Sequence, residues 1–318
     1  MATMTETVPT KAGVEYWHDF HAEANLLSGE LKRPIEQKII PQGELKLRGR
    51  SGGYSFQRVE NYSLEGLITI KSGYTRVAGF RSIKKATEDA WVTLATSVLE
   101  GFNVLDVLTA DRIVTQISTE HAKKNGHVPK VTFLGTQFQN LKVSGYEVKP
   151  ILNLNVCRHE ATSQPLLLDG PFLKNVQDQY DAIPEGSPLA DDLQTEYKQA
   201  GEEIKALKGD KGYKPEDGYK PRNPEHRALV CSLVSDLVIP EAIPGATRIG
   251  KNLLHVEEFG TISFGHLTVG RRLERARHGE PQDWSNYFTL KMLEMHLGCA
   301  GHGTVSVGST TGNGRTKP

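Results

Sequence analysis

The segment YEVKPILNLNV, residues Tyr146–Val156, carries the clearest structural signal in the chain. In an extended chain, Tyr146 and Val148 would point to one face and Glu147 to the other, and the alternation continues along the segment. A period of two is typical of a β-strand, because successive side chains of a strand point to opposite faces of the sheet. Pro150 has no backbone N–H to donate to a neighbour, so we expect this strand at a sheet edge or a bulge.

Similar patterns extend in both directions from this segment. Residues 64–71 and 112–119 alternate with the same period, and 91–99 are rich in apolar and β-branched side chains. Further strand-like runs are 228–239, 253–257, 260–269, 288–297 (which also fits a helix) and 304–308. Short glycine-containing breaks separate many of the runs. The expected fold is therefore mainly β, an antiparallel sandwich or barrel-like domain with a helical insertion.

The insertion is indicated by a change in composition. Residues 165–224 are rich in proline, glycine and charged side chains. Within them, Ser187 and Pro188 form a plausible helix start, apolar residues follow at helical spacing, and Gly209 is the expected end. We interpret the insertion as a decorated connection, with a lid or docking arm as the alternative.

The resulting domain prediction has four parts. Residues 1–53 are an N-terminal arm, and residues 54–160 and 228–308 form one β domain. Residues 161–227 are the Pro/Gly-rich helical insertion, and residues 309–318 are a flexible tail.

Composition excludes several functional classes. Lys and Arg number 38, as do Asp and Glu, so the zero net charge gives no general reason to expect binding to nucleic acid. No run of about 18 apolar residues is present, so we expect no membrane span. The N-terminus lacks a secretory signal pattern and the three cysteines suggest no disulfide framework, which favours a cytoplasmic location. An extracellular location stays open if the chain is processed.

Several common catalytic motifs are absent from the sequence. We find no P-loop, Rossmann fingerprint, H-E-x-x-H or paired C-x-x-C. No catalytic residue is therefore assigned and no organic cofactor is expected.

One cluster has metal-ligand spacing, His296-x-x-Cys299-x-x-His302. Imidazole nitrogen and thiolate sulfur are ordinary zinc ligands, and the adjacent glycines Gly298 and Gly301 would let the chain turn around an ion. The alternative is a turn with three unrelated side chains. The candidates for a fourth ligand are His255, His266 and Glu294. A second pair, His18 and His21, is interpreted as solvated residues on the N-terminal arm.

A longer segment resembles a known family. Residues Thr96–Ile113, TSVLEGFNVLDVLTADRI, are similar to bacterial β-rich proteins of the choice-of-anchor P family. Weaker similarity continues through 131–135, 141–148 and 259–262. The resemblance implies a β-rich domain of surface or assembly type without catalytic residues to transfer. The sequence departs from that family in its charged helical insertion and in lacking a signal or anchoring segment.

Three functions follow as hypotheses. The first is a non-enzymatic structural, binding or self-assembling protein, a homo-oligomer or partner of another protein, joined through β edges or the inserted helix. The second is a metal-dependent hydrolase or other metalloenzyme, with the insertion as a lid. The third is a carbohydrate- or lipid-binding module with an aromatic face. That face would draw on Trp17, Tyr54, Tyr62, Tyr74, Trp91, Trp284 and Tyr287.

Overall fold

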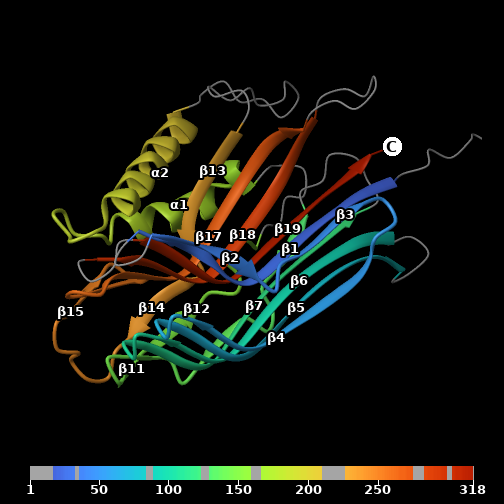
Figure 1. Cartoon of the computed structure of the whole chain (residues 1–318). Coiled ribbons are helices and arrows are strands. Elements are labelled where there is room, and N and C mark those ends of the chain that lie inside the picture. Colours follow the sequence, from blue (N-terminus) through green and yellow to red (C-terminus); the bar gives the residue numbers. More distant parts are fainter. Residues whose placement is uncertain are drawn as a thin grey trace, which may run out of the picture.

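The structure is a computed structural model that describes residues 17–32, 36–83, 89–122, 129–158, 166–209, 226–274, 283–298 and 303–317. Two antiparallel sheets pack face to face, and two helices lie on the outer face of one of them (Figure 1). Neither sheet closes into a barrel, because each runs from one terminal strand to a different one. The expected mainly β, antiparallel sandwich with a helical insertion is confirmed.

The first sheet, sheet A, has nine strands among the described residues. Its order is β15 (Ala246–Ile249), β16 (Leu253–Val256), β17 (Gly260–Glu274), β18 (Asp283–Leu297), β19 (Gly303–Lys317), β1 (Trp17–Leu31) and β2 (Gln37–Gln42). Beside this path, β13 (His226–Ser232) pairs with β17 and β3 (Leu45–Gly49) pairs with β1.

The second sheet, sheet B, has eight strands in the described part of the chain. Its order is β11 (Tyr146–Glu147), β10 (Lys142–Val143), β7 (Leu108–Ala122), β6 (Asp89–Val104), β5 (Ile68–Ile83) and β4 (Gly53–Leu64), with β8 (Lys130–Thr132) and β9 (Gln137–Gln139) beside β7. A small third sheet pairs β12 (Lys149–Leu152) with β14 (Val234–Val238). Pro150 thus lies in a two-stranded sheet whose register shifts after Ile151, which agrees with the expected edge or bulge. The single strand expected over Tyr146–Val156 is wrong, because the segment is divided between β11 and β12 in two sheets and strand structure ends at Leu152.

The core lies between sheets A and B and follows from the strand register. Phe264, Leu293 and Val307 are cross-strand neighbours on β17, β18 and β19, and all three are fully buried. Phe264 packs edge-to-face against Phe138 of sheet B, with ring centroids 6.4 Å apart. These apolar residues define the inner face of sheet A. Their chain neighbours Ser263, Glu294 and Ser306 therefore point outward.

Both ends of the chain differ from the domain prediction. Residues 17–31, 37–42 and 45–49, expected in an N-terminal arm, instead form β1, β2 and β3 of sheet A, and residues 309–317, expected in a flexible tail, belong to β19. Strands β1 and β19 pair from Trp17 opposite Lys317 to Leu31 opposite Gly303. Their backbone hydrogen bonds order both ends, although the glycine and threonine content of β19 resembles a loop.

The insertion contains two helices in its described part. The predicted helix is confirmed as α2 (Asp191–Gly209), which ends at the expected glycine. Its expected start at Ser187 and Pro188 is wrong, because the helix begins at Asp191. A second helix, α1 (Gly170–Tyr180), follows a 3-10 turn η1 (Leu166–Leu168) and was not predicted. The Asp169 side chain caps it by accepting a hydrogen bond from the backbone N–H of Phe172. Both helices pack on β13 at one end of sheet A (Figure 1).

A test of the sheet geometry uses two glycines with positive φ. A Cβ at Gly260 (φ +120°) would lie 2.1 Å from the carbonyl oxygen of His296, whereas a Cβ at Gly66 (φ +70°) would meet nothing within 4 Å. We expect Gly260→Ala to lower the free energy of unfolding by about 3 kcal/mol or more. The added Cβ would clash with the backbone at the end of β18, and neither that backbone nor the backbone of β17 can move aside. The control Gly66→Ala should cost about 1–2 kcal/mol, for conformation alone. Equal losses in chemical denaturation would contradict this packing.

Candidate metal centre beneath helix α2

The outer face of sheet A is polar where α2 covers it. Ser263, Glu294 and Ser306 are cross-strand neighbours on β17, β18 and β19, and they alternate with the apolar core residues of the same strands. His266 of β17, opposite Lys291 of β18, also reaches this face although it follows Phe264 by two residues, because Gly265, with φ of +66°, interrupts the alternation. A sheet face of this composition is unusual for a buried surface, because each buried polar atom needs a partner.

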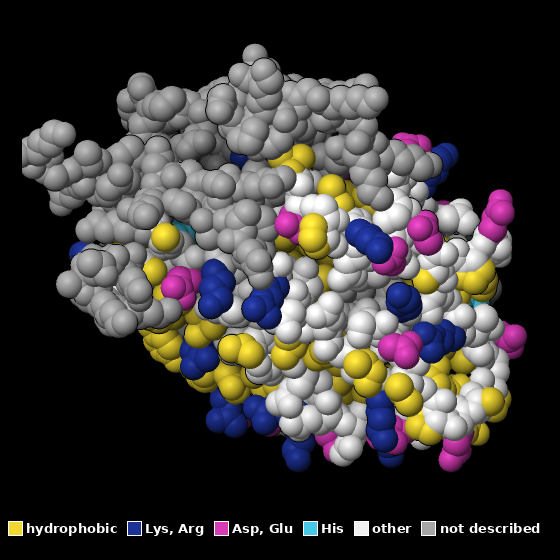
Figure 2. All heavy atoms as spheres, turned by 180° about the vertical axis from the view of Figure 1, so that it is seen from behind, with side chains coloured by type: hydrophobic (Ala, Val, Ile, Leu, Met, Phe, Trp, Pro, Cys, Tyr) yellow, Lys and Arg dark blue, Asp and Glu magenta, His cyan; other side chains and the backbone are white. Residues whose placement is uncertain are grey.

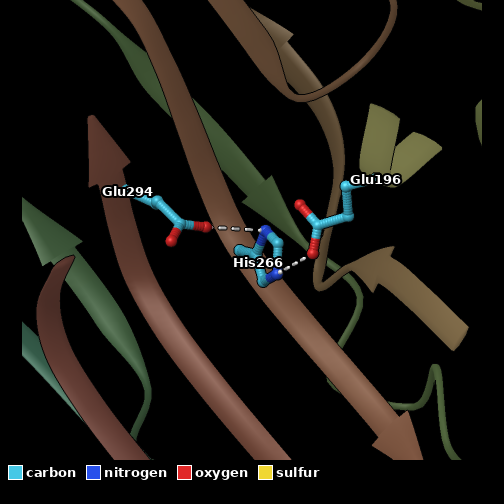
Figure 3. A group of neighbouring side chains, drawn as sticks. All are labelled: Glu196, His266 and Glu294. Atoms are coloured by element: carbon cyan, nitrogen blue, oxygen red, sulfur yellow. Dashed lines mark ion pairs between the residues drawn. The ribbon is translucent and has the colours of Figure 1, made fainter. Parts of the chain in front are cut away.

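Three side chains from three elements meet in this polar layer. His266 lies between Glu294 of β18 and Glu196 of α2, with the two carboxylates on either side of the imidazole ring (Figure 3). His266 Nδ1 is 3.0 Å from Glu294 Oε2, and His266 Nε2 is 3.5 Å from Glu196 Oε1. One ligand atom from each residue falls within 4.8 Å of the others. His266 and Glu294 are buried, while the Glu196 side chain is 34% exposed.

Neighbouring charges decide the state of Glu294. Burial by itself would raise the pKa of its carboxyl, but His266 and Lys291 together hold that pKa well below its ordinary value. Lys291 Nζ donates to Glu294 Oε1, and Ser306 Oγ lies 3.3 Å from the same oxygen. The second oxygen, Oε2, therefore remains for His266. Glu294 is ionised at neutral pH.

The contact between His266 and Glu294 is close but poorly aligned. Neither His266 Nδ1 nor Glu294 Oε2 makes a hydrogen bond of acceptable geometry, although the two atoms are 3.0 Å apart and buried. Both are ligand atoms for zinc and for other first-row divalent metals. An ion between these two atoms would be bound by His266 Nδ1 and Glu294 Oε2, while Glu196 faces the other ring nitrogen, Nε2, from which its Oε1 is 3.5 Å away.

The structure describes only one of the three metal ligands predicted from the sequence. His296 lies on β18 two residues after Glu294 and on the same face of the sheet, opposite Thr261 and Thr304. Cys299 and His302 lie outside the described residues. His266 and Glu294, two of the three candidates for a fourth ligand, are brought together.

The third candidate, His255, instead lies with Nδ1 3.2 Å from Thr261 Oγ1. Sequence reasoning missed Glu196, because nothing in the pattern of a charged amphipathic helix distinguishes the one glutamate that reaches the sheet.

A second histidine cluster lies elsewhere in the sandwich. His18 of β1 stacks on Trp91 of β6 with ring centroids 5.5 Å apart, and its ring centroid is 4.6 Å from that of His121 on β7. All three side chains are buried. The interpretation of His18 as a solvated arm residue is therefore wrong, because β1 is an interior strand of sheet A.

Burial also sets the protonation of this pair. Burial lowers the pKa of His18 to about 4. The pKa of His121 is lowered well below its usual range, mainly by burial and to a smaller extent by the nearby His18. Both imidazoles are neutral in the folded protein at neutral pH.

Comparison with known proteins identifies the family of this chain. The fold is an antiparallel β-sandwich with two helices over one sheet. Residues 18–270 match the model of the family described as domain of unknown function DUF8256, and the chain belongs to that family. Glu196 and His266 lie within the matched range, and Glu294 lies beyond it. No curated protein and no solved structure matches the chain significantly. Among the described helices, none is long and apolar enough to cross a membrane.

The buried histidines predict a pH dependence of stability. The unfolded chain binds protons at histidine near pH 6.5, whereas folded His18 binds one only near pH 4. Stability should therefore be constant above about pH 6.5 and fall as the pH drops from there towards 4. His18→Gln should make this acid loss smaller, and the control His255→Gln should leave it unchanged. The check is chemical denaturation across that pH range, and an equal acid slope in His18→Gln and the parent would contradict it.

Proposed function

We propose that this protein binds a divalent transition-metal ion between sheet A and α2, with Glu196, His266 and Glu294 as its ligands. The observation that carries the proposal is the convergence of their three ligand atoms within 4.8 Å. The three residues come from separate elements and are far apart in the sequence. This proposal combines the hypothesis of a binding protein with that of a metal-dependent protein. Its ligands differ from the predicted set His296, Cys299 and His302.

The donor set favours zinc or a similar ion. One imidazole nitrogen and two carboxylate oxygens are ordinary ligands of Zn²⁺, and three protein ligands leave a coordination position for water. The partly exposed Glu196 supports access from solvent on the side of α2. A metal-bound water at such a position has a lowered pKa, which is the basis for the hydrolase alternative.

The ion would also have a structural effect. Glu196 belongs to α2, whereas His266 and Glu294 belong to adjacent strands of sheet A. Metal binding would therefore link the insertion to the sheet, and the energy of binding would add to the stability of that contact.

The test is zinc titration of metal-free protein by calorimetry, with thermal unfolding as a second readout. We expect one Zn²⁺ per chain and a higher melting temperature with zinc. Glu196→Gln should weaken binding by about tenfold or more, because an amide is a poorer ligand than a carboxylate. The control Glu202→Gln changes an exposed carboxylate on the same helix and should bind zinc as the parent does. Failure of the parent to bind Zn²⁺ or Mn²⁺, or unchanged binding by Glu196→Gln, would overturn the proposal.

A second candidate function is self-assembly through sheet B. Strand β4 ends the sheet and pairs only with β5 among the described strands. On the outer face beside this edge, Tyr54, Phe56 and Phe80 are 64%, 50% and 49% exposed. A space-filling view from behind shows further hydrophobic side chains among charged ones over the lower half of the molecule (Figure 2). An exposed edge with adjacent aromatic side chains supports pairing with a second copy of this chain.

Light scattering coupled to size-exclusion chromatography tests this candidate. We expect the parent protein to elute as a dimer, and Phe56→Lys to shift it to the monomer, because a buried lysine would replace an aromatic contact. The control Leu134→Lys alters a residue between β8 and β9 that is at least as exposed as Phe56, and it should leave the dimer intact. A monomeric parent at the highest soluble concentration would exclude this assembly.

A further inference from the structure

A cavity of about 520 Å³ lies at the end of the sandwich where hairpin turns of both sheets meet. Sheet B contributes the turn between β6 and β7 and the turn between β10 and β11, while sheet A contributes the turn between β16 and β17 and the end of β18. The volume is within the usual range for small-molecule sites. The cavity is separate from the proposed metal centre, with which it shares no residue.

The walls are apolar and the charged groups are acidic. Leu105, Val107, Val256, Phe259 and Leu297 line the cavity together with Pro244. The charged side chains among the lining residues are Glu257 and Glu258, both exposed. A Cβ at Gly245 would lie 3.2 Å from Glu257 Oε2, which places that carboxylate against the cavity wall. A ligand that matches this lining has an apolar body and a positive charge.

Backbone strain is concentrated in the turns around the cavity. Leu105, Ser144 and Glu258 line it with φ of 53°, 50° and 63°, and Asp106 beside Leu105 has φ of 54°. Positive φ is uncommon outside glycine and is especially unfavourable for a leucine. Strain of this kind clusters at binding sites.

Hydrogen bonds hold the strained leucine in place. The N–H of Val107 donates to the carbonyl of Val104 across the turn. The N–H of Leu105 donates to the carbonyl of Leu67, and the N–H of Ser144 donates to the carbonyl of Val107. Three hairpin turns of sheet B are therefore tied together. The Leu105 side chain is held at the cavity, although it remains 44% exposed.

We infer that this cavity binds an organic amine with an aromatic or aliphatic body, whose ammonium group faces Glu257 and Glu258. The apolar walls supply the burial energy of the body. The two carboxylates select the cation, and their exposure makes that selection modest and sensitive to salt.

Three probes with the same indole body test the charge preference. Tryptamine is a cation, tryptophol is neutral and indole-3-propionate is an anion. In calorimetric titrations at low salt, we expect tryptamine to bind about two- to fivefold more tightly than tryptophol, and indole-3-propionate to bind most weakly. The double variant Glu257→Gln, Glu258→Gln should remove the advantage of tryptamine and leave tryptophol unchanged.

A second pair of variants separates the site from the fold. Leu105→Gly removes an apolar wall and relieves a strained φ, so it should weaken tryptamine binding by about tenfold while the melting temperature stays the same or rises. The matched control is Glu65→Gly, which changes a residue with φ of 47° at the corresponding position of the β4–β5 turn, outside the cavity. It should leave binding unchanged.

Three results would overturn the inference. They are no saturable binding of tryptamine by the parent, tighter binding of the anionic probe, and equal weakening by Leu105→Gly and Glu65→Gly. None of these measurements depends on a bound metal, so they leave the proposed metal centre to its own test.

Discussion

One hydrogen-bond register across β17, β18 and β19 determines which side chains of sheet A face sheet B and which face α2. With Phe264, Leu293 and Val307 turned inward, Ser263, Glu294 and Ser306 must point outward. A shift of one residue in any of these strands would turn a polar side chain, in β18 the Glu294 carboxylate, into the sandwich and expose a core side chain. The apolar core and the polar layer beneath α2 are therefore two consequences of the same pairing.

The interior changes character along the length of the strands. Near the cavity the core is built from large apolar side chains, whereas towards the N-terminal end of β1 the sheets approach each other over small and polar residues. A Cβ at Gly308 would lie 2.4 Å from Thr115 Oγ1 of the opposite sheet, so that contact requires glycine. The neutral pair His18 and His121 lies beyond these small residues, where His18 also stacks on Trp91.

The proposed metal centre and the end cavity use the scaffold in different ways. The metal ligands lie on regular elements, two on paired strands and one on a helix, which suits the precise geometry that an ion demands. The cavity is formed by turns of both sheets, where side chains can vary without disturbing the core. One site would attach the insertion to the sandwich, and the other would give the sandwich a place for an organic ligand.

The sequence by itself determined the β class, the edge position of Pro150 and the helix that ends at Gly209, because each depends on local periodicity or on the chemistry of one residue. It also singled out His266 and Glu294 as possible ligands by their residue types. Only the tertiary structure decided that β1 pairs with β19, that Glu196 reaches His266, and that distant turns line a cavity. Periodicity shows that a segment is a strand but not which strand it joins, and these features all depend on contacts between segments far apart in the chain.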